Sequence, residues 1–138
     1  MPNIHVFFAV FGFGDDPRVV TDMLGIEPSA AWAKGDPIRG ARGVRPHGRW
    51  ALHSPEDRSA PLETQLLALL PLLEARAAAV REVDARFEAG ILCACYFEEV
   101  NPGFHLDAPL LRRIAALGLP LDFDLYCLGP PDDDPATA

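Results

Sequence analysis

Apolar and polar positions along the chain repeat with two periods, and each period predicts one kind of element. Residues 3–11 are almost all apolar and rich in Phe and Val, which predicts a strand buried on both faces and central in its sheet. Residues 87–99 and 119–128 are apolar at every second position, which predicts strands whose apolar side chains share one face. In the last strand this face is expected to be buried, with the intervening side chains exposed to water. The apolar side chains are Phe87, Ala89, Ile91, Cys93, Cys95 and Phe97 in the first of these strands and Leu121, Phe123, Leu125 and Cys127 in the second.

Helical spacing of apolar residues predicts three helices. Two are short, residues 17–24 and 108–117, and each begins after a capping aspartate and ends at a glycine suited to a left-handed conformation. The third covers residues 62–86, where the helical phase runs straight across Pro71. We expect one long helix kinked near Pro71; the alternative is two helices with Pro71 at the start of the second. The capping and terminating residues of the short helices are Asp16 with Gly25 and Asp107 with Gly118.

Two further strands, residues 29–34 and 48–54, flank a segment rich in glycine, proline and arginine that resists regular structure. We call residues 34–49 the Gly/Arg loop and expect a long hairpin around it. The resulting order, βαββαβαβ, predicts a single α+β domain over residues 1–128. Its sheet is expected to be mixed or antiparallel with helices packed on one face, of ferredoxin-like or related type. Residues 129–138 are acidic and proline-rich, have nothing to bury, and are expected to be disordered.

Length and composition agree with one domain. The chain has 138 residues, of which 49% are hydrophobic, enough for one sizeable core and too few for two ordinary domains. Its longest apolar runs fall well short of the about 20 residues that span a bilayer. The N-terminus has neither the basic region nor the cleavage site of a secretion signal. We therefore expect a soluble, cytoplasmic protein without a membrane partner.

The three cysteines, Cys93, Cys95 and Cys127, lie inside apolar strand patterns and are odd in number, so they are expected to be reduced core thiols. Cys93 and Cys95 would share one face of a strand, and a metal site with His53 or His105 is conceivable. The CxxC and HxxxH spacings of zinc sites are absent from the sequence, however. Neither a metal nor a cofactor is expected.

Charge is distributed unevenly along the chain. The formal net charge is −8 at pH 7, but the Gly/Arg loop holds five basic residues against one acidic residue, a net charge of +4, which leaves −12 for the remainder. An acidic body disfavours nucleic-acid binding, whereas a short basic loop suits a phosphate, a carboxylate or an acidic patch on a partner protein. The competing interpretation is an exposed loop whose charges only keep the surface solvated.

Two tryptophans, Trp32 and Trp50, flank the Gly/Arg loop and would lie near each other if the strands pair. Large rings of this kind usually anchor a core, but a tryptophan pair beside arginine would also stack on a planar or cationic ligand. Lys34 and Asp36 surround a turn at Gly35. Asp36 is expected either to fix that turn through side-chain hydrogen bonds or to act with Lys34 in chemistry.

No catalytic residue can be assigned from motifs. Glu98 and Glu99 precede an Asn-Pro-Gly turn and His105, but adjacent strand residues point to opposite faces, so only one of the two carboxylates would face any pocket. Ser54 follows His53 directly, without the nucleophile elbow of hydrolases. The glycines form no nucleotide-binding pattern either.

Three segments resemble one known family. They are LGIEPSAAWAKGDPIRG, GRWALHSP and CYFEEVNPGFHLDAPLLRRIAALGLPLDFDLY, and in this order they resemble domain of unknown function 4279, a largely bacterial family. The family pattern is an LGI-x-P helix exit followed by Ser or Thr, then W-x-K/R-G-D/E, a glycine-rich stretch and a G-x-W strand. It maps onto residues 24–29, 32–36 and 48–54. The resemblance covers nearly the whole chain and implies a small stand-alone α+β domain without an assigned reaction, cofactor or catalytic residue.

The leading hypothesis is a non-enzymatic binding or interaction module that recognises a protein partner or a small anionic ligand with the Gly/Arg loop. One version is an acidic immunity or inhibitor protein that masks a basic active site with the carboxylates of its body. A second hypothesis is a small enzyme, in which the loop holds an anionic substrate while Asp36 or Glu98 transfers a proton. A third is a homo-oligomer formed through an unpaired edge strand. The expected ligand-binding residues are Trp32, Lys34, Asp36, Arg39, Arg42, Arg45 and Trp50.

Overall fold

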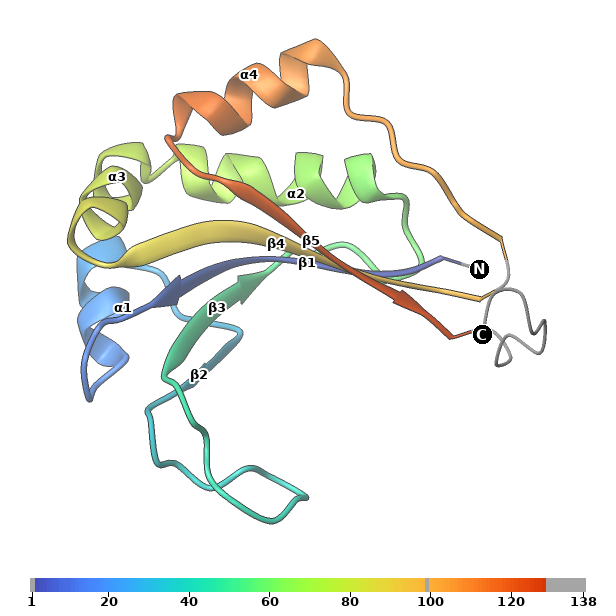
Figure 1. The fold of residues 1–138 in the computed structure, drawn as a ribbon. Helices are drawn as coiled ribbons and strands as arrows, with labels where there is room; N and C mark the ends of the chain where they lie inside the picture. The colour runs from blue at the N-terminus through green and yellow to red at the C-terminus, as the bar shows by residue number, and fades with distance from the viewer. Residues whose placement is uncertain (1, 99, 129–138) are drawn as a thin grey trace.

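A computed structural model describes residues 2–98 and 100–128 of the chain. The elements of this part are β1 (Asn3–Phe11), α1 (Arg18–Leu24), β2 (Ala30–Trp32), β3 (Arg49–His53), α2 (Leu62–Glu74), α3 (Ala77–Arg86), β4 (Glu88–Phe97), α4 (Ala108–Ala116) and β5 (Leu121–Cys127). The strands form one sheet in the order β2-β3-β1-β4-β5, in which only β4 and β5 run parallel (Figure 1). The tail that we expected to be disordered, residues 129–138, lies outside the described residues.

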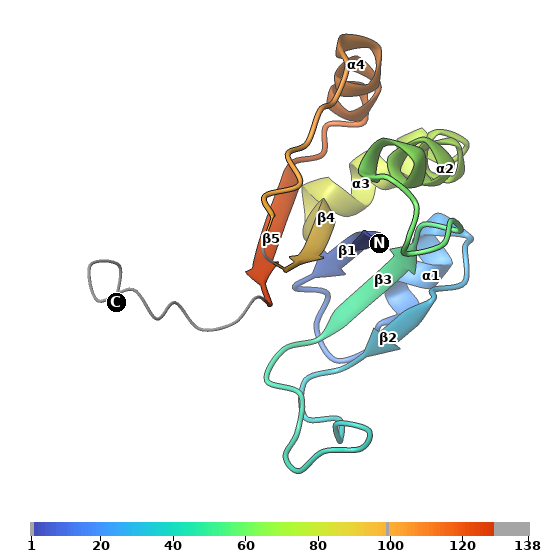
Figure 2. The ribbon, with the colours of Figure 1, turned by 90° about the vertical axis from the view of Figure 1, so that its right-hand side faces the viewer.

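All the described helices lie on one face of the sheet, to the right of the strands in Figure 2. The expected α+β fold, with a mixed sheet and helices on one face, is therefore confirmed. We call the other side of the sheet the open face, because none of the described helices covers it. The Gly/Arg loop extends from the strands on this side of the molecule, below the sheet in Figure 1.

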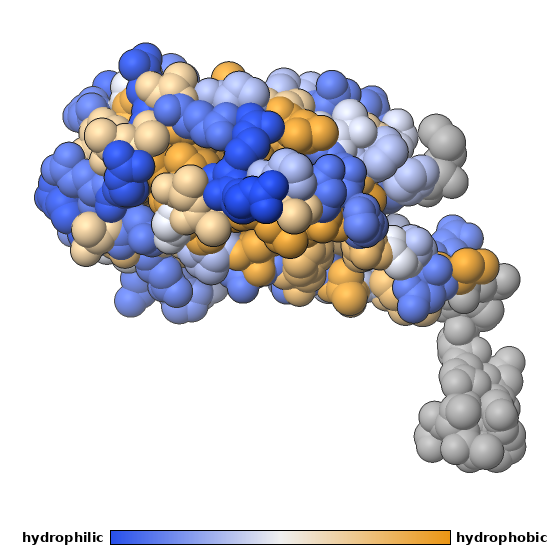
Figure 3. Space-filling model, turned by 90° about the horizontal axis from the view of Figure 1, so that it is seen from above, coloured by the Kyte–Doolittle hydropathy of each residue, from blue (hydrophilic) through white to orange (hydrophobic). Residues whose placement is uncertain are grey.

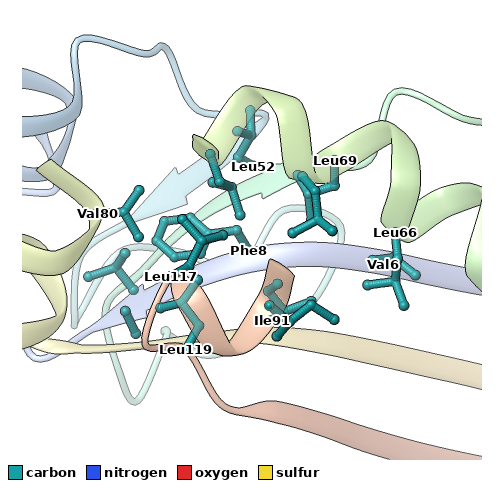
Figure 4. Close-up of a cluster of buried hydrophobic side chains, with 14 of the residues drawn as sticks. Val6, Phe8, Leu52, Leu66, Leu69, Val80, Ile91, Leu117 and Leu119 are labelled. Carbon is teal, nitrogen blue, oxygen red and sulfur yellow. The ribbon is translucent and has the colours of Figure 1, made fainter. Parts of the chain in front are cut away.

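β1 is the central strand, as its apolar composition predicts. It lies between β3 and β4, with Val10 opposite Trp50 at one end and Asn3 opposite Tyr96 at the other. Figure 4 shows the helix side of the core, where Phe8 lies among residues from α2, α3 and the segment after α4. The buried side chains of β1 are Ile4, Val6, Phe8 and Val10 toward the helices and Phe7 and Ala9 toward the open face.

Residues 62–86 form two helices, so the expectation of one kinked helix is wrong. Pro71 lies inside α2, which also excludes a second helix that starts at Pro71. The break falls at Arg76, whose φ of −125° and ψ of 32° are not helical. α2 packs on β1, whereas α3 turns to pack on α1 and β4, and both helices face the same core. The apolar phase continues across the break because it records which side is buried and not the direction of the helix axis.

β5 differs most from its prediction. Phe123 and Leu125, expected on a buried face, are 40% and 57% exposed, and Cys127 is also exposed rather than a core thiol. Their face is the helix side of the sheet, because Phe123 pairs in register with the buried Cys93 of β4. α4 precedes β5 but packs toward α2, so only Leu121 of this face is partly covered. Alternation in the sequence shows which side chains share a face, and the placement of the helices decides whether that face is covered.

Candidate functional site

The Gly/Arg loop forms a second, narrow hairpin that continues from β2 and β3. The N–H of Gly35 donates to the carbonyl of Arg45, and the N–H of Arg45 donates to the carbonyl of Asp36, both at 2.8 Å. Farther out, Pro37 and Val44 form an isolated antiparallel bridge. The loop therefore holds a defined backbone at its base, although its glycines and prolines do not allow a long regular strand.

Asp36 fixes the start of this hairpin. Its Oδ2 accepts a hydrogen bond from the N–H of Ala33 at 2.8 Å, which closes the turn that contains Gly35. Gly35 has a φ of +90°, a conformation that side chains other than glycine rarely adopt. The structure thus agrees with the interpretation in which Asp36 stabilises the turn.

The base of the hairpin brings two arginines onto one tryptophan. The guanidinium carbon of Arg45 lies 3.8 Å from the centre of the Trp32 ring, and that of Arg49 lies 4.7 Å from it. Arg49 also lies 4.8 Å from the ring centre of Phe7 on β1. The indole N–H of Trp32 donates to the carbonyl of His47 at 3.1 Å, which fixes the ring. We call Phe7, Trp32, Arg45 and Arg49 the arginine–aromatic cluster.

Strand pairing places this cluster on the open face. Trp32 of β2 is the register partner of Arg49 of β3, and the side chains of paired residues point to the same side of a sheet. Phe7 of β1 pairs with His53, four positions along β3 from Arg49, and this even spacing places it on that side as well. The cluster therefore spans β2, β3 and β1 and takes Arg45 from the loop.

The positive charge of the cluster has no carboxylate partner among the described residues. The ion pair found in residues 2–98 and 100–128 joins Arg113 and Glu74 on the helix side, at 2.6 Å. The Nε of Arg49 is buried and has no hydrogen-bond partner within the described part of the chain. Burial and, second, the positive charge of Arg45 lower the pKa of Arg49. Two neighbouring guanidinium groups that are partly removed from water favour the binding of an anion.

The open face continues from the cluster as an aromatic surface. The rings of His5 and His53 meet edge to face with centres 4.4 Å apart, beside Phe7. Tyr96 and Tyr126 stack with centres 4.8 Å apart. Burial, followed by the positive charges of His53 and of nearby arginines, lowers the pKa of His5 to about 4. His5 is therefore neutral near pH 7.

Acidification should weaken the fold through His5. Its pKa is about 4 in the folded chain and near 6.5 in the unfolded chain, so the unfolded chain binds more protons between these values. The contribution of His5 is therefore fully present above pH 6.5 and declines as the pH falls toward 4. In urea denaturation, the free energy of unfolding should decrease from pH 7 to pH 4.5 by about 1 kcal/mol less in His5→Gln than in the wild type, a value reduced for solvent screening. If the free energy of unfolding decreased equally in His5→Gln and in the wild type, the lowered pKa of His5 would be contradicted.

The other expected site residues are dispersed. Lys34 is exposed and lines a cavity of about 580 Å³ together with Phe13, His47 and Glu88. Arg39 and Arg42 lie in the exposed outer part of the hairpin, outside the contacts of Trp32.

Trp50 and Trp32 do not lie side by side, so the expected tryptophan pair is wrong. Trp50 pairs with Ala31 and is fully buried on the helix side, whereas the next residue of β2, Trp32, points to the open face. The indole N–H of Trp50 donates to Thr21 Oγ1 of α1 at 3.0 Å. Trp50 is thus a core anchor, one of the two interpretations of the sequence, and does not form part of a surface site.

The residues considered for acid–base chemistry lie at opposite ends of the sheet. Lys34 adjoins the end of β1 near Trp50, and Glu98 follows the end of β4 near Asn3. A second cavity, of about 730 Å³, includes Glu98 and not Lys34. The geometry thus removes the single cleft on which the enzyme hypothesis with these two residues depended.

The cysteines and histidines considered for a metal site are also separated. Cys93 and Cys95 are buried on the helix side, and burial raises the pKa of Cys93 to about 12, so its thiol stays protonated. His53 lies on the open face beside His5. Within residues 2–98 and 100–128, no group of three His, Cys, Asp or Glu side chains is arranged to hold a metal ion.

Sequence reasoning missed Arg49, Phe7, His5 and His53 as members of one surface. The signal was present in the alternation of β1 and β3, where each of these residues occupies the phase opposite to the main core. The alternation identifies a single surface only when the register that pairs β1 with β3 is known.

The chain was compared with family models, with curated proteins and with solved structures. The sequence model for the domain of unknown function (DUF4279) matches residues 2–128. No curated protein and no solved structure matches the chain. In the described part of the chain, no helix has the length and apolar character needed to cross a membrane.

Proposed function

The chain belongs to the DUF4279 family, and we propose that it is a binding module that holds a carboxylate of an acidic partner protein at the arginine–aromatic cluster. The observation that carries this proposal is a pair of guanidinium groups, Arg45 and Arg49, on one tryptophan ring without a carboxylate partner among the described residues. Arg45 comes from the hairpin formed by the Gly/Arg loop, and Arg49, the last residue of that loop, is the first residue of β3.

Stacking on Trp32 prepares the arginines for this role. A guanidinium that lies over an aromatic ring uses its face, so the N–H groups on its edge stay free to bind a carboxylate with two hydrogen bonds. The ring also restricts the arginine side chains before binding, which lowers the entropy lost when the complex forms. An incoming anion would reduce the repulsion between the two cations.

The charge of the rest of the chain supports selectivity. Outside the Gly/Arg loop the net charge is −12, so an acidic partner is repelled from most of the surface and attracted only near the +4 loop. Arg39, Arg42 and Lys34 act in this proposal through long-range attraction and not through direct stacking. Salt should therefore weaken binding by lowering the association rate.

The direct test measures binding of a hexaglutamate peptide by isothermal titration at low and at physiological salt. The Arg45→Gln, Arg49→Gln double variant should raise the Kd at least about tenfold, the usual loss when charge-assisted hydrogen bonds are removed. Arg81→Gln is the matched control, since Arg81 is an exposed arginine of α3 on the helix side. It should leave the Kd unchanged.

Two further probes separate the alternatives. Hexalysine tests the immunity or inhibitor hypothesis, in which the acidic body binds a basic surface. Inorganic phosphate and small dicarboxylates test whether the site takes a small anion in place of a protein segment. A wild-type chain that binds hexalysine and not hexaglutamate, or a double variant that binds hexaglutamate like the wild type, would overturn the proposal.

A further inference from the structure

The outer edge of β5 carries an uncovered apolar surface formed by described residues. Its exposed side chains on the helix side continue an apolar surface that includes Phe104, which stacks with Phe123 at 6.1 Å. Seen from above the helices, orange apolar surface runs along the lower margin of Figure 3, on the side where β5 lies. Among the described strands, β5 pairs with β4 on one side only, so the backbone groups at its other edge have no partner within residues 2–98 and 100–128. The exposed large apolar residues of β5 and its end are Phe123, Leu125, Tyr126 and Leu128.

We propose that β5 pairs in antiparallel fashion with β5 of a second copy of this chain, about a two-fold axis at Leu125. The two five-stranded sheets would then form one continuous sheet of ten strands. This inference is independent of the proposed anion site, because the arginine–aromatic cluster lies at the β2 and β3 side of the sheet.

The hydrogen-bond pattern of β5 restricts how a second strand can pair with it. The N–H of Leu128 donates to the carbonyl of Phe97 at 2.6 Å, and the carbonyl of Pro120 accepts from the N–H of Ile91 at 3.0 Å. In a parallel ladder alternate residues direct both backbone groups to the same neighbour, so the even-numbered residues of β5 face β4. The odd-numbered residues therefore direct their N–H and C=O groups to the free edge, and odd positions must oppose odd positions.

The two aspartates of β5 select among the symmetric registers that remain. An axis at residue 123 places Asp122 opposite the partner's Asp124, and an axis at residue 124 places Asp124 opposite its own mate. Like charges directly opposite each other destabilise a pair of strands. An axis at Leu125 places Asp124 opposite the partner's Tyr126, whose hydroxyl can donate to the carboxylate. An axis at residue 126 also separates the aspartates but pairs only residues 124–128, whereas the Leu125 axis pairs residues 122–128.

The register with the axis at Leu125 also accounts for the alternating apolar residues of β5, which are exposed to solvent in a single chain. On the helix side, Leu125 would contact its own mate and Phe123 would contact the partner's Cys127, so apolar side chains meet apolar side chains. On the open face, Tyr126 would extend its stack with Tyr96 toward the partner's Asp124. A row of apolar residues that is complementary to itself under a two-fold axis fits a second copy better than an unrelated strand.

The first test measures the mass of the full chain by light scattering after size exclusion, over a range of concentrations. The wild type should reach twice the mass of the chain, and Leu125→Asp should raise the dimer Kd at least about tenfold by placing two charges on the axis. Leu67→Asp is the control, because Leu67 is 46% exposed on α2, away from β5. Leu125 is itself exposed, so its variant should remain folded with a cooperative thermal transition, and its Tm should fall only by the stabilisation that dimer formation gives the wild type.

The second test examines the register. In a Cys127→Ser background, Leu125→Cys should form a disulfide-linked dimer under oxidation. Opposed residues of an antiparallel hydrogen-bonded pair have Cα atoms about 5.5 Å apart, within the range of disulfides. Phe123→Cys in the same background should not crosslink, because its mate lies several residues away. A wild type that stays monomeric at high concentration, a dimer that survives Leu125→Asp, or crosslinking through residue 123 and not 125 would overturn the proposal.

Discussion

Replacement of Trp50 by alanine should lower the free energy of unfolding by about 3–5 kcal/mol, the range found for the removal of a buried aromatic side chain. Trp50 is fully buried, meets Phe8 edge to face at 6.1 Å, and donates its indole N–H to Thr21. Alanine removes the ring from the core and leaves the Thr21 hydroxyl without this donor. Equilibrium urea denaturation followed by circular dichroism measures the loss.

Two further variants separate the contribution of the buried ring from that of its hydrogen bond, and the buried tryptophan from the partly exposed one. Trp50→Phe keeps most of the ring and loses the hydrogen bond, so it should cost only about 1–2 kcal/mol. Trp32→Ala removes a half-exposed ring from the open face and should also cost only about 1–2 kcal/mol. If Trp32→Ala destabilised the chain as much as Trp50→Ala, the division into a core tryptophan and a surface tryptophan would be wrong.

Gln65→Leu should lower the free energy of unfolding by about 2–4 kcal/mol, because it leaves several buried backbone groups without partners. Gln65 is 1% exposed and is the buried polar side chain of the described core. Its Oε1 accepts from the N–H of Val6 at 3.3 Å, and its Nε2 donates to the carbonyls of Ile4 at 2.8 Å and Ala60 at 3.1 Å. Leucine has a similar volume, so the loss would come from hydrogen bonding and not from a cavity.

The same denaturation experiment measures this effect, with Leu67→Ala as the control on α2. Leu67 is 46% exposed, so its truncation should change stability by less than about 1 kcal/mol. A Gln65→Leu variant within 1 kcal/mol of the wild type would show that water or a shift of the backbone replaces the amide. Gln65 also connects α2 to the start of β1, close to His5 and Arg58 of the open face. We therefore expect Gln65→Leu to reduce the free energy of hexaglutamate binding by less than it reduces the free energy of unfolding.

Because the helix side and the open face of the sheet are separate, the hexaglutamate binding test can distinguish recognition from stability. Trp50 and Gln65 support the helix side, whereas the arginine–aromatic cluster lies on the open face. Substitutions at Arg45 and Arg49 remove charge from a partly exposed surface and should not open the core. A loss of binding in these variants can therefore be assigned to recognition and not to unfolding.

Part of the candidate site could be predicted from the sequence. Trp32, Arg45 and Asp36 were identified because a basic, glycine-rich segment between two strands differs from ordinary core and surface. The structure unites Trp32 and Arg45, gives Asp36 a structural role, and removes Trp50 from the surface. Arg49 could not be assigned to the site because the exact register of β2 and β3 decides that it meets Trp32. Phe7 joins the cluster only through the pairing of β1 with β3, two strands that are distant in sequence.

The sequence by itself determined the elements that depend on local chemistry. β1 has the predicted limits, and the short helices α1 and α4 end at or near the predicted glycines. Capping, glycine conformation and the alternation of apolar residues act within a few residues, so they can be recognised without the fold.

Only the tertiary structure decided which faces are covered and which residues meet. The break between α2 and α3, the exposure of β5 and the opposite directions of Trp32 and Trp50 all depend on how distant elements pack. A shift of one position in strand register moves every side chain to the other face, and no local signal fixes that register. The arginine–aromatic cluster and the uncovered edge of β5 are therefore properties of the folded chain, formed by residues that the sequence keeps apart.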